Sequence, residues 1–170
     1  MNNLTIAFSM FLLLLTACNN NTGKDVNNKK PGGKEMADLN TYLIEKDRER
    51  IISYVERKGL NMKETKSGLW FMIKTNGSGG SLKDKDKLIV QYKCSLLDGT
   101  LIYSSEALGA KEIVLGRSEI EAGLNEGLRM LGHRGEATFI LPPFLGFGLT
   151  GDNKSIPPRA ILVYEIKIMN

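Results

Sequence analysis

The sequence contains few of the residues from which metal sites and acid–base centres are built. Its 170 residues include two cysteines and one histidine, and none of these are spaced like zinc ligands. A disulfide-bonded scaffold, a tetrahedral zinc site and a catalytic triad based on histidine are therefore excluded. We expect no metal and no other cofactor.

Charge of one sign is also scarce. The chain has 23 Lys and Arg residues against 19 Asp and Glu residues, a net charge of +4, and the two signs are interleaved. A nucleic-acid-binding face would need clustered basic residues, so nucleic acid is not an expected partner. Hydrophobic residues at 42% and charged residues at 25% are ordinary globular values, and the length suits one domain with an extension.

The most apolar stretch, residues 6–15, is too short to span a membrane, because a spanning helix needs about 20 residues. It has the length of a signal-peptide core. Leu15-Thr16-Ala17-Cys18 follows and resembles the bacterial lipobox, in which the cysteine is lipidated and becomes the new N-terminus. The alternative is a buried N-terminal helix with an inert Cys18, which the polar sequence from Asn19 onward disfavours.

The lipobox resemblance implies a lipoprotein signal peptide at residues 1–17. Cys18 would then carry diacylglycerol and an amide-linked acyl chain such as palmitate, and several chains anchor a protein far better than one. We therefore expect a protein of the bacterial cell envelope, tethered by lipid on Cys18 to the outer membrane and facing the periplasm.

Between this cysteine and the globular part, the sequence predicts a tether and then a helix. Residues 18–35 are rich in Asn, Gly and Lys without an apolar face, which predicts a flexible tether. Apolar residues recur at helical spacing over residues 36–58, which predicts an amphipathic helix within a helical extension at residues 36–66. This helix either packs on the following domain or forms a dimer.

The remaining sequence, residues 67–170, is a series of strand patterns with one helix pattern among them. The helix pattern covers residues 120–131. Strands are expected at residues 69–73, 87–97, 100–104, 111–115, 136–141 and 160–169. Because strands do not alternate with helices, the sequence predicts an α+β domain with an antiparallel sheet of five to six strands around one short helix.

Three features resemble functional motifs, but their sequence context does not support a function. Residues 146–151 match G-x-G-x-x-G, but prolines precede the match and no helix can follow it, so dinucleotide binding is excluded. Glu119 and Glu121 alternate before the helix pattern, but no nucleophile accompanies them, and solvated or helix-capping roles fit better. Cys94 lies within a strand pattern and is interpreted as a small buried side chain.

A set of apolar and aromatic residues on different elements could surround one cleft or form ordinary core. The set comprises Tyr92, Ile102, Tyr103, Ile113, Ile120, Leu124, Phe147, Ile156 and Tyr164.

Four short motifs, at residues 90–92, 97–100, 123–128 and 156–162, read VQY, LDGT, GLNEGL and IPPRAIL. In this order and spacing they resemble the FKBP-type peptidyl-prolyl cis-trans isomerases, and the resemblance covers residues 86–170. The upstream helix and the lipobox are similar to the lipoprotein members of this family in bacteria, including the gliding-motility-associated ones. The family fold is a bent antiparallel sheet that wraps a short helix, which agrees with the expected order of elements.

The resemblance implies a cleft that holds a proline ring. Tyr92 and Tyr164 correspond to aromatic walls, Leu124 to the floor, and Phe147 to the flap over the cleft. The positions implied for catalysis are Tyr92, Ile102, Tyr103, Ile120, Leu124, Phe147, Ile156 and Tyr164, and those implied for substrate binding are Glu119, Glu121 and Ile113.

Four of these positions differ from the family pattern. Leu124 stands where the family usually has Trp, although Leu also occurs there in active bacterial members. Glu121 replaces an apolar rim residue. Tyr103 replaces an Asp and Phe147 replaces a Tyr, so two polar groups that the family uses on ligand carbonyls are missing.

The family's reaction breaks no bond, which fits the lack of acid–base groups. We expect a peptidyl-prolyl isomerase that assists the folding of cell-envelope proteins, with proline-containing polypeptides as its partners. The alternative, favoured by the departures at Tyr103, Leu124 and Phe147, is a non-catalytic peptide-binding or chaperone module, or a component of the gliding machinery.

Overall fold

The computed structural model describes residues 32–170. The signal-peptide pattern, Cys18 and most of the expected tether lie outside the described residues. The chain divides into two units, Met1–Glu35 and Met36–Asn170, and the sheet and both cores belong to the second. Within residues 32–170, no helix combines the length and the apolar character needed to cross a bilayer.

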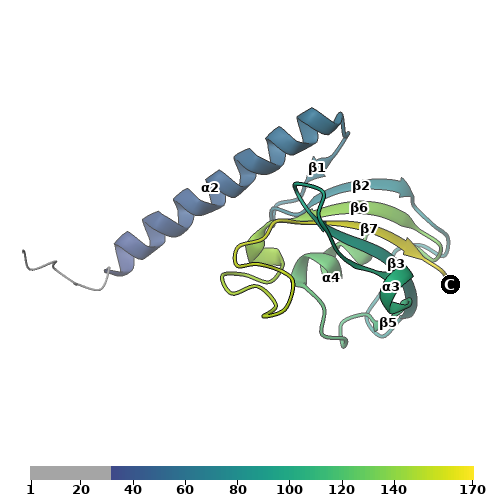
Figure 1. The fold of residues 1–170 in the computed structure, drawn as a ribbon. Helices are drawn as coiled ribbons and strands as arrows, with labels where there is room; N and C mark the ends of the chain where they lie inside the picture. The colour runs from purple at the N-terminus through teal and green to yellow at the C-terminus, as the bar shows by residue number, and fades with distance from the viewer. Residues whose placement is uncertain (1–31) are drawn as a thin grey trace, which may run out of the picture. The chain divides into compact units, whose positions relative to one another are not determined.

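Seven antiparallel strands form one sheet in the order β1-β2-β6-β7-β3-β4, and β5 pairs with the first residues of β3 on the same edge that β4 uses further along the strand (Figure 1). The strands are β1 (Lys63–Glu64), β2 (Trp70–Thr75), β3 (Lys87–Leu96), β4 (Leu101–Ser104), β5 (Lys111–Val114), β6 (Glu136–Leu141) and β7 (Leu162–Ile168). The α+β class expected from the sequence is confirmed. The two-residue β1 raises the number of strands above the five to six expected.

Alternation along β3 shows how the sheet separates its two faces. Leu88, Val90 and Cys94 are buried on the face that we call inner, whereas Gln91 and Lys93 are exposed on the outer face. This follows from the two-residue period of a strand. The inner faces of β2, β3, β6 and β7 together form the main hydrophobic core.

One short helix, α4 (Ala122–Leu128), packs against the inner face of the sheet (Figure 1). Two glycines allow the close approach: a Cβ on Gly127 would lie 2.8 Å from the ring of Phe139, and one on Gly123 would lie 2.7 Å from Leu141. The helix is shorter than the pattern at residues 120–131. After Leu128 the chain tightens into turns, in which Met130 bonds back to the carbonyl of Gly127.

The N-terminal helix α2 (Gly33–Lys58) packs on the domain through its C-terminal half. Ile51, with only 1% of its surface exposed, joins a second core with Trp70, Ile140, Ile161 and Val163 on the outer face of β2, β6 and β7. The packing role expected for this helix is thus confirmed. In its N-terminal half, the larger apolar side chains Met36, Leu39 and Tyr42 are about half exposed.

Two short elements were not expected from the sequence. Helix α3 (Ser105–Leu108) directly follows β4, and the hydroxyl of Ser104 caps it by accepting a 3.3 Å hydrogen bond from the amide of Ala107. A single 3-10 turn, η1 (Pro143–Leu145), follows β6. Leu145, the last residue of η1, packs against the main core.

Candidate substrate-binding cleft

A cleft of about 460 Å³ opens on the inner face of the sheet, beside α4. Most of its wall is apolar or aromatic, with two carboxylates and two lysines among the polar groups. Its lining residues are Val90, Tyr92, Tyr103, Leu108, Lys111, Ile113, Glu121, Leu124, Phe147, Asp152, Lys154, Tyr164 and Ile166.

Regular elements position most of this wall. Tyr92 on β3 and Tyr164 on β7 face inward because strand alternation places them on the face of the main core. The hydroxyl of Ser105 accepts a 3.1 Å hydrogen bond from the amide of Tyr92, and this contact ties β3 to the start of α3. Leu124 is 3% exposed and contributes the side of α4 that faces the sheet.

The structure brings seven of the eleven residues proposed for the site together around the cleft. They are Tyr92, Tyr103, Ile113, Glu121, Leu124, Phe147 and Tyr164. Ile102 and Ile120 are half-buried against the main core, and Ile156 is buried within it, so these three support the wall from behind. Glu119 is exposed and does not line the cleft.

Sequence reasoning missed six lining residues, namely Val90, Leu108, Lys111, Asp152, Lys154 and Ile166. Val90 and Ile166 could have been found, since each lies two residues from a proposed wall tyrosine on the same strand and therefore on the same face. Asp152 carried a weaker signal, because Asp often organises a turn by accepting bonds from the amides that follow it.

Asp152 links the loop after β6 to β4. Its carboxylate accepts a short hydrogen bond from the hydroxyl of Tyr103 on one oxygen, and bonds from the amides of Lys154, Ser155 and Ile156, at 2.8 to 3.0 Å, on the other. Desolvation opposes ionisation, but these four bonds outweigh it and lower the pKa of Asp152 to about 2. The same hydrogen bond raises the pKa of Tyr103.

A second pair of this kind lies deeper in the cleft. The hydroxyl of Tyr164 donates a 2.5 Å hydrogen bond to one carboxylate oxygen of Glu121. Burial raises the pKa of Tyr164, and the negative charge of Glu121 adds to that effect. Cys94 is fully buried, as expected from its place in a strand pattern, and this burial raises the pKa of its thiol to about 11.

The groups that line this cleft are arranged for non-covalent binding. Cys94, the thiol beside the cleft, stays protonated near neutral pH, and the hydroxyls of Tyr103 and Tyr164 already donate to carboxylates. Within residues 32–170, no group of three or more His, Cys, Asp or Glu side chains is arranged to hold a metal ion. What the arrangement offers is an apolar pocket with aromatic walls that can enclose part of a ligand.

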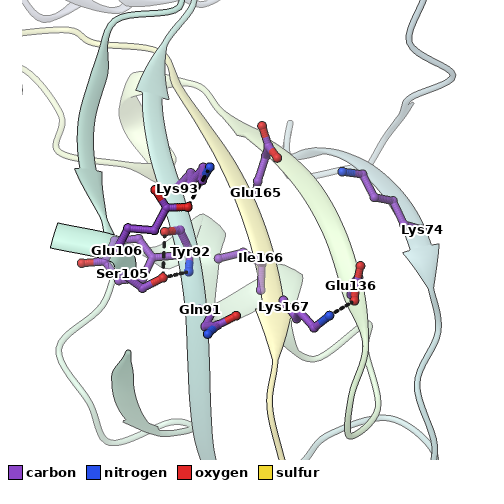
Figure 2. A pocket seen from close by; sticks show the side chains of 10 residues that line it. All are labelled: Lys74, Gln91, Tyr92, Lys93, Ser105, Glu106, Glu136, Glu165, Ile166 and Lys167. Atoms are coloured by element: carbon purple, nitrogen blue, oxygen red, sulfur yellow. Dashed lines mark hydrogen bonds and ion pairs between the residues drawn. The ribbon is translucent and has the colours of Figure 1, made fainter. Parts of the chain in front are cut away.

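A second hollow, of about 310 Å³, lies over the outer face of the sheet near α3 (Figure 2). Its side chains are mostly charged and of both signs. Lys93 pairs with Glu106 at 3.0 Å and Lys167 pairs with Glu136 at 2.8 Å, as the dashed lines show. Such alternating, mutually compensated charges are typical of a solvated sheet face, so we regard the inner cleft as the candidate site.

Known proteins resemble this chain in sequence. A family model described as FKBP-type peptidyl-prolyl cis-trans isomerase matches residues 79–169, just over half of the chain. A probable FKBP-type peptidyl-prolyl cis-trans isomerase of Haemophilus influenzae is 31% identical over 113 residues, which cover 66% of this chain and 46% of that protein. A probable enzyme of the same description, FkpA of Neisseria meningitidis serogroup B, is 35% identical over 108 residues, 64% of this chain and 39% of that protein. The chain thus spans less than half the length of these curated relatives.

Solved structures resemble it in fold. FkpA from Escherichia coli superposes with a TM-score of 0.62 at 22% identity, covering 85% of this chain and 75% of that one. A peptidyl-prolyl cis-trans isomerase from Pseudomonas syringae superposes with a TM-score of 0.63 at 20% identity, covering 76% and 93%. At these identities the likeness establishes the architecture of the chain.

Proposed function

The chain belongs to the FKBP-type peptidyl-prolyl cis-trans isomerase family, and on that premise we propose that its inner cleft isomerises X-Pro bonds in polypeptides. The observation that carries this proposal is the cleft itself, whose walls converge from three elements as Tyr92, Leu124 and Tyr164. A proline ring is apolar and compact, so a pocket of this size and lining suits it.

The reaction needs nothing more than such a pocket. Resonance holds the amide planar and creates a barrier of roughly 18 to 20 kcal/mol between cis and trans. At the twisted transition state that resonance is lost, and apolar walls that exclude water from the carbonyl favour the twisted form. A thousandfold acceleration requires about 4 kcal/mol of such preference.

Two-dimensional NMR exchange on a proline-containing peptide, with and without the full chain, tests this proposal. We expect faster cis–trans exchange with the chain present. Phe147→Ala should reduce the acceleration about tenfold or more, because it removes an aromatic wall of the cleft. Phe144→Ala is the matched control: it lies three residues away, is 47% exposed and does not line the cleft. Equal exchange with and without the chain would refute the proposal.

One observation favours a second function, the holding of a peptide without catalysis. The hydroxyls of Tyr103 and Tyr164 already donate to Asp152 and Glu121, so a substrate carbonyl could use them only by displacing a carboxylate. Under this alternative the chain is a peptide-binding or chaperone module, or a component of a gliding machinery. Chemical shift changes in the peptide without faster exchange would establish it.

We also propose that the protein acts in the bacterial cell envelope, anchored by lipid on Cys18, where it assists the folding of envelope proteins. The lipobox pattern at residues 15–18 supports this. Labelled palmitate fed to the producing bacterium should be incorporated into the chain and lost in Cys18→Ser, while Cys94→Ser keeps the label. Unchanged labelling of Cys18→Ser would refute the anchor.

A further inference from the structure

We propose that Asp47 on α2 is a positioning residue for the cleft. Through its ion pair with Arg159, Asp47 holds the loop at residues 146–160, and this loop carries Phe147 on the cleft wall and Ile156 behind it. The affinity of the cleft for proline-containing chains thereby depends on a helix that does not touch it. This inference rests on the proposed use of the cleft for such chains.

The burial of Asp47 is the first observation. It is 4% exposed, although the residues on either side of it in α2 are exposed. Its carboxylate lies 2.5 Å from the guanidinium of Arg159 and 3.6 Å from that of Arg50. Burying an unpaired carboxylate costs a large amount of folding free energy, and the ion pair with Arg159 offsets this cost at Asp47.

The backbone of Arg159 is the second observation. Its φ is +56°, in the left-handed region that side chains other than Gly rarely adopt. Contacts on both sides hold it there: the guanidinium binds Asp47, and the backbone amide donates a 3.0 Å hydrogen bond to the carbonyl of Gly148. A residue kept in an unfavourable conformation by such contacts marks a constrained point in the loop.

The third observation is the route from Arg159 to the cleft. Gly148, which accepts the bond from Arg159, directly follows Phe147. At the other side of the loop, Asp152 binds Tyr103 of β4 and the amide of Ile156. The loop is therefore tied to β4 through Asp152 and to α2 through Arg159. If the contact with α2 is released, the loop that carries Phe147 and Ile156 loses one of its restraints.

The same helix offers a matched control. Arg48 of α2 binds Glu64 of β1 through three hydrogen bonds of 2.8 to 3.1 Å. This ion pair also joins α2 to the domain, but it contacts β1 and does not reach the loop. Glu64→Gln and Asp47→Asn make the same chemical change, and only the second acts on Arg159.

The test measures binding of a blocked Ala-Leu-Pro-Phe tetrapeptide by NMR titration, on the full chain and its variants. We expect Asp47→Asn to raise the dissociation constant about three- to tenfold, which lies within the roughly two- to thirtyfold range typical of coupling through a protein, and to shift the amide resonances of residues 146–160. Arg159→Gln removes the same ion pair from the loop side and should have the same effect, which keeps the proposal testable if Asp47→Asn does not fold. Glu64→Gln should change affinity less than twofold.

The outcomes separate the two proposals. If Asp47→Asn, or Arg159→Gln in its place, binds the peptide as the unaltered chain does, or if Glu64→Gln weakens binding equally, Asp47 does not position the loop. If the unaltered chain binds the peptide but does not speed up cis–trans exchange, only the isomerase proposal fails, because the peptide affinities of the variants and the unaltered chain can still be compared. Failure of the unaltered chain to bind the peptide would overturn both.

Discussion

Two carboxylates in the cleft accept hydrogen bonds from tyrosine hydroxyls, and they differ in how fully their oxygens are used. Asp152 engages both oxygens, one with Tyr103 and one with three backbone amides, so it holds the loop in place. Glu121 uses one oxygen, toward Tyr164. Its other oxygen makes it the carboxylate better placed to meet a donor on a bound chain.

At this scale we expect Asp152→Asn to remove part of the pH dependence of stability. The pKa of Asp152 is about 2 in the folded chain, below the value of about 4 for an unfolded Asp. Between about pH 4 and pH 2 the unfolded state therefore binds more protons than the folded state. The stabilisation of the fold by ionised Asp152 is complete above about pH 4 and is lost as the pH falls toward 2. Urea unfolding at pH 5 and pH 2.5 measures the loss.

The variant should lose about 1 kcal/mol less unfolding free energy between these two pH values than the unaltered chain, since solvent screening weakens such a contribution. Asp38→Asn, which changes an exposed carboxyl on α2, is the control and should match the unaltered chain. If Asp152→Asn and Asp38→Asn lose the same unfolding free energy between pH 5 and pH 2.5, the role given to Asp152 is wrong.

The residues of the site were predictable where strands determine them and less so in the loop. Tyr92 and Tyr164 follow from alternation, which fixes a face from the sequence. Asp152 and Lys154 could not be placed in this way, because the path of the loop depends on hydrogen bonds that no periodicity records. Ile156 was expected on the flap with Phe147, and in the structure it is a buried residue of the main core that does not line the cleft.

At the scale of elements, the close packing of α4 on β6 depends on two glycines of the helix, Gly123 and Gly127. Gly127→Ala should lower the unfolding free energy by about 1 to 3 kcal/mol, because the added Cβ would meet the ring of Phe139 at 2.8 Å. Urea unfolding measures this. Gly146→Ala, whose Cβ would make an ordinary 3.5 Å contact with Leu162, should change stability far less; equal losses would argue against the close packing.

The two halves of α2 should differ in the same kind of measurement. Ile51→Ala empties a place in the second core and should cost about 2 to 5 kcal/mol of unfolding free energy. Leu39→Ala, twelve residues earlier on the same helix and 49% exposed, should cost less than about 0.5 kcal/mol. A comparable cost at both positions would mean that the N-terminal half is also packed.

Periodicity predicted this helix but not its most informative residue. Leu39, Leu43, Ile51, Ile52 and Val55 recur at helical spacing, which is enough to predict an amphipathic helix. Asp47 belongs to the polar part of that pattern and is nevertheless buried. Its burial depends on the ion pair with Arg159, which lies 112 residues away in the sequence. No local signal identifies a pairing of that range.

On the scale of the whole molecule, β2, β6 and β7 carry a core on each face. The main core and α4 cover the inner face, and the C-terminal half of α2 covers part of the outer face. A chain that begins at Leu60 would therefore expose Trp70, Ile140, Ile161 and Val163. We expect it to lose about 3 kcal/mol or more of unfolding free energy relative to the full chain. Thermal and urea unfolding measure this loss, and unchanged stability would show α2 to be a dispensable appendage.

The class of the domain and the order of its elements along the chain could be anticipated because the strand patterns, their turns and the family-like motifs agree with one another. The packing of α2 on the domain was expected, but the face of the sheet that it covers could not be predicted. This packing depends on a few apolar side chains, such as Val163 and Ile140, at outward positions where the rest of each strand is polar. When a strand is apolar on both faces over only a few residues, its sequence does not show which element covers the second apolar face.

Trp70, the single tryptophan of the chain, lies beneath α2 with 8% of its surface exposed. Its indole is thus a natural fluorophore at the junction between helix and sheet. When α2 leaves the sheet, water reaches this ring and its emission shifts to longer wavelength, with no label attached and no interference from another indole. The docking of α2 can therefore be followed optically during folding or peptide binding, in real time and at low protein concentration.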